Sequence, residues 1–202
     1  MRNKLAKRFR GFLPVVLDVE TGGLKSETDA LLEIAIVLLG MNDAGQLFPR
    51  TTHFCHIVPF NGARLDPAAL AINQIDPYHP FRFAVSEREA LTEIFQHIEA
   101  ALVAEQCERA VLVGHNANFD LSFIQAAAKR CHIRELPFHS FTTFDTAGLA
   151  GVALGETVLA RAARTAGIAF DREKAHSAIY DAERTAELFC YIVNHWRLDR
   201  SN

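Results

Sequence analysis

Residues 14–22 read Pro14-Val15-Val16-Leu17-Asp18-Val19-Glu20-Thr21-Gly22, an apolar run that carries two acids. The β-branched and apolar residues predict a strand inside a sheet, and the glycines at its end predict a sharp turn. Because side chains alternate along a strand, Asp18 and Glu20 should leave the same face, with their Cβ atoms about 6.6 Å apart. Carboxylates this close repel unless a cation lies between them, and an all-oxygen site suits Mg²⁺ or Mn²⁺. The alternative is a strand at the edge of the sheet whose acids point into water.

The composition predicts a single domain over residues 1–202, in which residues 1–11 form a basic N-terminal arm. Hydrophobic residues make up 50% of the chain, enough to bury a sizeable core. No apolar run approaches the roughly 18 residues that cross a bilayer, and the N-terminus lacks the apolar segment and cleavage site of a signal peptide. The sequence therefore predicts a cytoplasmic protein with no membrane contact.

The net charge and the spacing of the cysteines limit how the chain could bind nucleic acid or zinc. The formal net charge is -3, so nucleic acid would have to be held by a local group of cations rather than by the whole surface. The four cysteines are far apart and lack the paired spacing that is typical of zinc sites. We expect small buried apolar residues, rather than disulfide partners or zinc ligands, at Cys55, Cys107, Cys131 and Cys190.

The order of the predicted elements indicates an α/β fold. Strands are predicted at 14–22, 31–39, 51–58, 110–114 and 141–145, and helices at 67–72, 86–105, 119–131, 157–166 and 178–196. The first three strands follow one another directly, which favours an antiparallel meander, whereas the later strands alternate with helices. We therefore expect a central mixed β-sheet flanked by α-helices.

Two further acids are predicted on apolar helix faces. Asp120 lies in the first turn of a predicted helix. The residues that share its face are Ile124, Ala127, Ala128 and Cys131. An acid on such a face needs a partner, although acids are also common at helix starts without any function. Asp181 begins a similar line in the last helix, and His176 precedes it by five residues. Taken alone, a histidine at this place is more often an ordinary surface or capping residue.

Together these residues predict a metal-dependent hydrolase. Four carboxylates carry at most four negative charges, which two divalent cations would neutralise. Two such ions about 4 Å apart can hold the attacking and the leaving oxygen of a phosphoryl displacement. The remaining task is to take a proton from water. His176 is suited to it because an unperturbed imidazole has a pKa of about 6.5. The predicted reaction is hydrolysis of a phosphodiester bond.

The order and surroundings of these residues resemble the DEDDh 3′→5′ exonucleases of the DnaQ-like superfamily. The matching stretches are Asp18-Val19-Glu20-Thr21-Gly22-Gly23, Gly114-His115-Asn116-Ala117-Asn118-Phe119-Asp120 and His176-Ser177-Ala178-Ile179-Tyr180-Asp181. Within that superfamily the chain is most similar to the bacterial ribonuclease T family, over nearly its whole length. The resemblance implies an RNase H-like fold. It also implies that His176 is the general base and that two Mg²⁺ ions, which Mn²⁺ can replace, are bound by Asp18, Glu20, Asp120 and Asp181.

The same resemblance implies a substrate class and an assembly. The implied activity is trimming of the 3′ ends of tRNA and other small stable RNAs, with activity on single-stranded DNA 3′ overhangs as well. The implied assembly is a head-to-tail homodimer in which a basic patch on one subunit feeds the active site of the other. Arg8, Arg10 and Arg109 match positions of that patch, and clustered cations attract phosphates whatever the net charge. The alternative is that they are solvated surface arginines.

Base stacking is the point at which this sequence departs from that family. Ribonuclease T places four aromatic side chains around the terminal bases, and Phe119 and Phe141 match two of them. Leu24 and Ile72 stand at the other two positions, and Ala68 stands where an acid is expected. Stacking on an aromatic ring is worth about 1–3 kcal/mol per base. We therefore expect altered discrimination at the 3′ end, especially against terminal cytosine. The alternative for the two phenylalanines is core packing.

Two other functions are compatible with the same residues. A DNA proofreading or repair 3′→5′ exonuclease would use the same acids and histidine, so the bond-cleaving residues do not separate it from an RNA-trimming enzyme. A catalytically silent nucleic-acid-binding or scaffold domain is disfavoured, because buried like charges are costly to keep without a metal.

Overall fold

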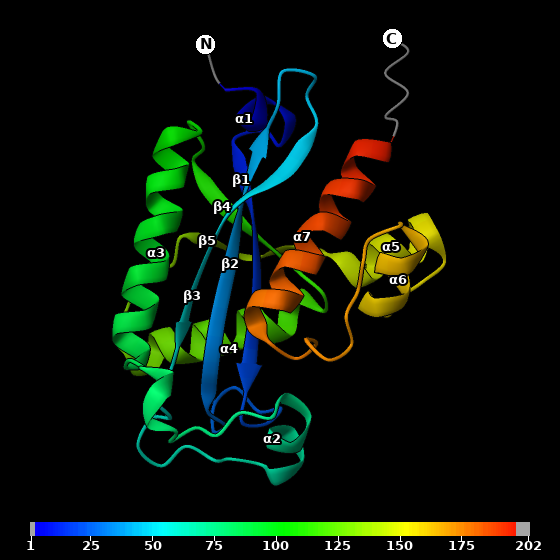
Figure 1. Ribbon diagram of the computed structural model, residues 1–202. Helices are drawn as coiled ribbons and strands as arrows, with labels where there is room; N and C mark the ends of the chain where they lie inside the picture. Colours follow the sequence, from blue (N-terminus) through cyan, green and yellow to red (C-terminus); the bar gives the residue numbers. More distant parts are fainter. Residues whose placement is uncertain (1–2, 197–202) are drawn as a thin grey trace.

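The computed structural model describes residues 3–196, which form a five-stranded sheet in the order β3-β2-β1-β4-β5 (Figure 1). The strands are β1 (Phe12–Thr21), β2 (Leu31–Met41), β3 (Leu47–His56), β4 (Arg109–Gly114) and β5 (Phe138–Asp145). β1, β2 and β3 pair antiparallel, whereas β1, β4 and β5 pair parallel. The predicted meander and mixed sheet are therefore both present.

The helices connect and cover these strands. They are α1 (Lys4–Arg8), α2 (Pro67–Asn73), the 3₁₀ helix η1 (Pro80–Arg82), α3 (Glu87–Ala104), α4 (Ala117–Arg130), α5 (Thr146–Leu154), α6 (Leu159–Thr165) and α7 (Ala178–His195). α3 begins with a capping box between Ser86 and Glu89, which satisfies backbone N–H groups at the first turn. None of the helices in residues 3–196 combines the length and the apolar composition needed to cross a bilayer.

Helices cover both faces of the sheet. α7 lies along β1, β2 and β3, and α5 and α6 pack against it, while α3 and α4 pack together on the other face (Figure 1). β2 is buried at every position except its last, Met41. Such complete burial is expected of a central strand that is covered on both sides.

The topology brings the carboxyl ends of three strands to one edge of the sheet. β1, β4 and β5 run parallel, so the chain leaves all three of them at the same edge. β1 carries its two acids close to this end, Gly114 ends β4, and Asp145 ends β5. The antiparallel neighbour β2 starts at this edge and places Glu33 directly opposite Glu20. Crevices at the carboxyl ends of parallel strands are common ligand sites.

Some elements differ from those predicted. β3 begins at Leu47, and α4 begins at Ala117, two residues before the predicted start. α1 and α5 are additional helices. The short α1 lies within the predicted basic arm, but its Leu5 and Ala6 are buried against the sheet. Met1 and Arg2, which also belong to that arm, lie outside the described residues.

None of the four cysteines forms a disulfide bond within the described residues, and the predicted burial is found for two of them. Cys55 and Cys190 are buried, whereas Cys107 and Cys131 are only partly buried.

Candidate active site

Asp18 and Glu20 lie near the end of β1, on the face along which α7 packs. Both are partly buried. The strand is followed by the sharp turn that the glycines predict. A Cβ added at Gly23 would lie 2.1 Å from Asp29 Oδ2, so only glycine fits there. From α2, the Asn73 side-chain amide donates a hydrogen bond to the carbonyl of Thr21 over 3.0 Å. The end of β1 is thus held in place directly after its acids.

Asp120 is buried in the first turn of α4 and reaches back to β1. Its Oδ1 accepts a hydrogen bond from the backbone N–H of Val19 over 3.0 Å. This bond fixes its carboxylate beside the backbone that joins the two acids of β1. This arrangement requires the end of β4 to lie close to the first turn of α4. A Cβ added at Gly114 would lie 3.0 Å from Ala117 Cα and 3.2 Å from Asp120 Oδ2.

Asp181 and His176 come from the start of α7 and the loop before it. The backbone N–H of His176 donates to Asp181 Oδ2 over 3.0 Å. Atoms of Glu20, His176 and Asp181 that could each bind a metal lie within 4.8 Å of one another. Asp181 Oδ1 is buried and has no hydrogen-bond partner within residues 3–196. Because a buried carboxylate oxygen without a partner is costly, this atom is suited to bind a cation.

The acid cluster is the name used here for Asp18, Glu20, Asp120 and Asp181, and burial is the largest cause of the raised pKa of each. Burial raises the pKa of Asp18 well above its ordinary value, and the charges of Asp120, Asp181 and Glu20 raise it further. Burial, followed by the charges of Asp181 and Glu33, raises the pKa of Glu20 to about 8. Burial also raises the pKa of Asp120, although the hydrogen bond from Val19 opposes it. For Asp181 the same cause raises the pKa and the backbone N–H of His176 opposes it.

These properties fit a divalent metal site. The acid cluster supplies oxygen ligands, which hard divalent cations prefer, and one buried oxygen among them lacks a partner. A bound cation would reverse the pKa shifts, because it favours the ionised form of every carboxylate around it. His176 is exposed and its ring lies near the same atoms. Its position suits either a metal ligand or a base that acts on water beside the metal.

Glu33 is a residue of this region that sequence reasoning missed. Its Oε2 accepts a hydrogen bond from the backbone N–H of Ala178 over 3.3 Å, and its Oε1 lies 3.0 Å from His56 Nδ1. The Arg82 guanidinium is 4.0 Å away. Glu33 therefore ties the first turn of α7, the helix that carries Asp181, to β2. An acid inside the apolar run 31–39 was the signal that could have indicated it.

His115 is a second histidine near the acid cluster. Its Nδ1 lies 3.0 Å from Thr146 Oγ1, and its Nε2 lies 2.9 Å from the carbonyl oxygen of Thr157. Burial lowers the pKa of His115, and the nearby charges of Asp145 and Asp181 oppose this shift. Because both ring nitrogens are engaged, His115 is positioned to hold α4, α5 and the following turn together. His176 is the more accessible of the two.

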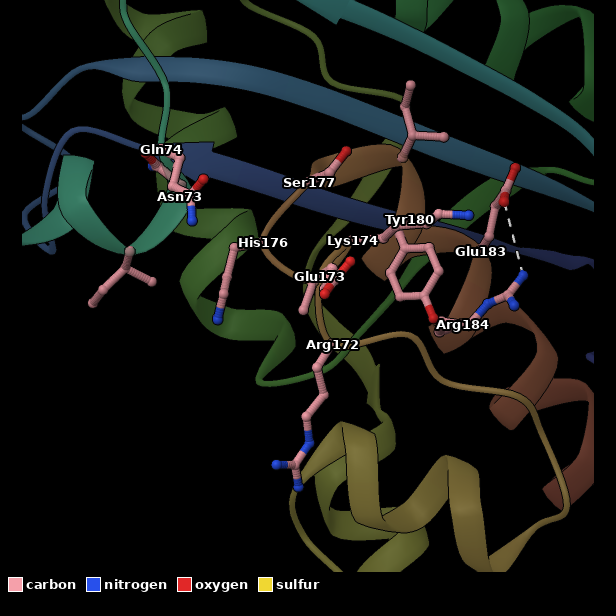
Figure 2. A pocket seen from close by; sticks show the side chains of 13 residues that line it. Asn73, Gln74, Arg172, Glu173, Lys174, His176, Ser177, Tyr180, Glu183 and Arg184 are labelled. Carbon is pink, nitrogen blue, oxygen red and sulfur yellow. Dashed lines mark ion pairs between the residues drawn. The ribbon is translucent and has the colours of Figure 1, made fainter.

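A cavity of about 640 Å³ lies between the end of α2 and the start of α7 (Figure 2). Ile72, Asn73 and Gln74 line one side, and the loop that carries His176 lines the other. The cations Arg172, Lys174 and Arg184 also belong to its walls: Figure 2 shows Arg172 and Arg184 around Tyr180 and the loop. Glu173 and Glu183 line it as well, and Arg184 is ion-paired with Glu183, so the cavity carries charges of both signs.

The four candidate stacking residues differ in their surroundings. Leu24, Ile72 and Phe141 are 83%, 59% and 80% exposed. Phe119 is partly buried, and its ring packs on that of Phe123 with centroids 5.0 Å apart. Phe141 lies where the pairing of β5 with β4 is irregular, and its ring contacts His139 at 4.6 Å. Core packing thus accounts for part of the Phe119 ring, whereas the other three side chains are available for contact.

The structure does not bring the candidate basic residues to the acid cluster. Phe12 begins β1 and pairs with Arg109, which begins β4. Arg109 and the nearby Arg10 are both exposed. At about 3.3 Å per residue, the strand from Phe12 to Glu20 is about 26 Å long. Arg8 donates from its guanidinium to the carbonyl of Val193 over 2.9 Å. The arginines therefore lie at the far end of the sheet from the acids.

Known proteins with similar sequences identify the family. An exonuclease family model matches residues 15–189 of this chain. Ribonuclease T of Shewanella sp. (strain W3-18-1) is 59% identical over 196 residues, which cover 96% of this chain and 87% of the relative. Ribonuclease T of Shewanella oneidensis is also 59% identical, over 96% of this chain and 88% of the relative.

Solved structures with lower sequence identity share the fold. A crystal structure of E. coli exonuclease I in complex with a dT13 oligonucleotide has a TM-score of 0.68 at 16% identity and covers 90% of this chain. The zinc-bound form of the E. coli exonuclease I complex with single-stranded DNA has a TM-score of 0.69 at 16% identity and covers 91%. This chain spans 41% of the length of each of these structures.

These similarities confirm three predictions from the sequence: the RNase H-like α/β fold, the enzyme class and the family. The family model extends over most of the strands and helices that build the acid cluster. The chain belongs to the ribonuclease T family of 3′→5′ exoribonucleases.

Proposed function

We propose that this enzyme trims the 3′ ends of tRNA and other small stable RNAs and also shortens single-stranded DNA 3′ overhangs. The observation that carries the proposal is the group formed by Glu20, His176 and Asp181, in which one buried carboxylate oxygen lacks a partner. Relatives named ribonuclease T favour RNA as the main substrate over DNA proofreading or repair. With such substrates, the cytoplasm is the expected compartment.

The acid cluster would hold two Mg²⁺ ions, with Mn²⁺ as a substitute. Bound ions supply Lewis-acid stabilisation of the charge that develops on the phosphate and its leaving oxygen. Asp120, fixed by the N–H of Val19, and Asp181, fixed by the N–H of His176, keep their carboxylates oriented in advance. Preorganised ligands need no rearrangement during the reaction.

His176 would act as the general base. Its imidazole takes a proton from the attacking water and releases it to solvent, which its exposure permits. Asp181 assists by accepting the backbone N–H of His176, which holds the loop beside the cluster. The left-handed backbone of His176, with φ of 66°, sets the direction in which the loop enters α7.

In a head-to-tail homodimer, Arg10 and Arg109 of one subunit would contact RNA that is bound at the active site of the other. Arg10 lies just before β1 and Arg109 begins β4, and the opposite ends of these strands carry or adjoin the acids. Within one subunit the two arginines are therefore separated from the site by the length of the sheet. In a dimer, the basic end of one subunit can face the acid cluster of the other. RNA would then be held by one protomer and cleaved by its partner.

Recognition of the terminal base would differ from that of relatives with four aromatic residues. Leu24 and Ile72 are both exposed, and Ile72 lines the cavity that contains His176, so these side chains can cover a base face without aromatic stacking. We expect a double variant, Leu24→Phe with Ile72→Phe, to shift the relative trimming rates on RNAs that end in A, C, G or U. An unchanged preference in that variant would remove the support for altered discrimination.

The function is tested with 5′-labelled RNA that carries an unpaired 3′ tail. We expect Mg²⁺-dependent shortening one nucleotide at a time, no activity in chelator, and no cleavage of circular RNA, which has no 3′ end. A protein that leaves the linear RNA intact in Mg²⁺, or cuts the circular RNA, would contradict the proposal. Faster shortening of mismatched duplex DNA than of RNA would favour proofreading instead.

A further inference from the structure

Residues 76–85, here called the aromatic loop, connect α2 to α3 and contain η1. Three of their side chains are aromatic and highly exposed: Tyr78 at 71%, Phe81 at 76% and Phe83 at 83%. No other stretch of the described residues presents three such exposed aromatic side chains within six positions. Single exposed apolar residues are ordinary, but a concentration of exposed aromatic rings indicates a contact surface.

The loop is held in one conformation by its backbone partners. The Arg82 guanidinium donates to the carbonyl of Leu32 over 2.9 Å and to that of Pro77 over 3.2 Å. The N–H of Val85 donates to the carbonyl of His56 over 2.9 Å, which joins the end of the loop to β3. Because its guanidinium already binds the carbonyls of Leu32 and Pro77, Arg82 is not free to bind phosphate. What the loop offers to a ligand is its aromatic rings.

The aromatic loop is continuous with the active site. It starts after Gln74, which lines the cavity that also contains His176 (Figure 2). The loop also contacts β2 next to the acids. Its Arg82 guanidinium lies 4.0 Å from the carboxylate of Glu33, which is the cross-strand partner of Glu20. The start of the loop and Arg82 therefore lie on the same edge of the sheet as the acid cluster.

We propose that Tyr78, Phe81 and Phe83 stack against unpaired bases of the substrate that lie on the 5′ side of the nucleotide being removed. This inference rests on the proposed function and assigns it a second substrate contact. The rings are separate from one another: the ring contact found for Phe81 is with His79, at 5.7 Å between centroids. Separate exposed rings leave their faces open to bases, which suits single-stranded nucleic acid better than a continuous protein surface.

The loop would also compensate for the aliphatic residues at the catalytic end. Leu24 and Ile72 provide no aromatic face, whereas the loop that follows Ile72 provides three. Stacking reads no particular base, since every base has a π-face. The loop therefore contributes affinity for an unpaired tail without selecting its sequence.

The test compares the triple variant Tyr78→Ala/Phe81→Ala/Phe83→Ala with wild type on RNAs whose unpaired 3′ tails increase from two to about ten nucleotides. Two matched controls, Val103→Ala and Val152→Ala, remove side chains that are 81% and 77% exposed on α3 and α5. We expect the triple variant to raise KM about tenfold or more on long tails and to leave kcat and dinucleotide cleavage unchanged. The controls should match wild type throughout.

Two further measurements identify stacking as the cause. Phe81→Tyr with Phe83→Tyr should retain the low KM, whereas Phe81→Leu with Phe83→Leu should raise it. The loss should be nearly independent of salt, because stacking, unlike phosphate contact, releases no counterions. A triple variant with wild-type KM on every tail length would overturn the proposal. The proposal would also be overturned if the triple variant changed the oligomeric state in sedimentation but not KM. The aromatic loop would then be a protein interface.

Binding separates this inference from the proposed function. Fluorescence anisotropy of labelled single-stranded RNA in chelator measures the loop contact without any cleavage. Tail-length-dependent weakening in the triple variant supports the aromatic loop even if wild type proves unable to trim RNA. Trimming by wild type with equal RNA binding by both proteins would leave the nuclease assignment intact and exclude the loop contact.

Discussion

The two ends of the central sheet carry opposite charges in different surroundings. At the carboxyl ends of β1, β4 and β5, four acids are at least partly buried, and burial raises the pKa of each of them. At the beginning of β1 and β4, Arg10 and Arg109 are exposed to solvent. Burial strengthens the interaction of the acids with a cation, whereas exposure lets arginines meet a large polyanion. The formal net charge of -3 conceals this separation.

The largest effect is expected from removing a charge at the acid end. Asp120→Asn keeps an oxygen that can accept the N–H of Val19 but loses a negative charge of the proposed metal site. We expect kcat/KM to fall at least about 10⁴-fold, since several kcal/mol of transition-state stabilisation would be lost. Exonuclease assays in Mg²⁺ measure this. The exposed Asp43, paired with Lys4, provides the control Asp43→Asn, which should behave as wild type. Equal activity of both variants would exclude Asp120 from the metal site.

A smaller loss is expected when the base is removed and the acids are kept. His176→Ala should lower kcat about 10²- to 10³-fold, the usual contribution of a positioned general base. Metal and RNA binding should be retained, as measured by calorimetry and anisotropy. His195→Ala, in the last turn of α7, is the control on an exposed histidine. Normal cleavage by His176→Ala would mean that the base is misassigned.

The acid end should also make stability depend on pH when no metal is bound. Glu20 has a folded-state pKa of about 8 against an ordinary value of 4.5, so the folded protein retains a proton that the unfolded chain has lost. The contribution of Glu20 to the free energy of unfolding has its full value below about pH 4.5 and is lost as the pH rises through about 8.

Thermal unfolding in chelator between pH 5 and pH 9 measures this dependence. The Tm should fall with rising pH, and Mg²⁺ should reduce the fall, because the cation favours the ionised carboxylates. Glu20→Gln should flatten the curve in chelator. A Tm that rises across this range in both proteins would contradict the assignment of raised pKa values to the acid end.

The smallest effect is expected at the basic end. Arg10→Ala with Arg109→Ala should raise KM for RNA several-fold and leave kcat unchanged. If each arginine contacts one phosphate of a single strand, the slope of log K against log salt should decrease by about 1.4. Arg8 is a less direct probe, because its guanidinium also binds the Val193 carbonyl at the end of α7. An unchanged salt dependence would leave these arginines as solvated surface residues.

Much of the site could be predicted because its residues violate local rules. Acids inside the apolar strand around Val19, and Asp120 on an apolar helix face, indicate function from the local sequence alone. The three strands of the meander could also be predicted, because their apolar runs are separated by a turn and by the loop after the first strand. These features depend on short stretches of sequence.

The rest depends on how distant segments meet. α5 was missed because Thr146–Leu154 is composed of small and apolar residues with no polar face. The role of Glu33 depends on the β1–β2 register, which places it opposite Glu20 and against the first turn of α7. The exposure of Phe141 depends on irregular pairing of β5 with β4. Register, irregular pairing and helix contacts are tertiary properties that a single sequence does not display.

The position of α7 in the chain has a consequence for synthesis. β1 and α4 supply Asp18, Glu20 and Asp120, whereas His176 and Asp181 come with α7, which follows both of them in the chain. Ribosomes make proteins from the N-terminus, so a growing polypeptide contains the first three acids before it contains the fourth acid and the histidine. The site that we propose is therefore assembled in two stages, and the group assigned as its base arrives in the second.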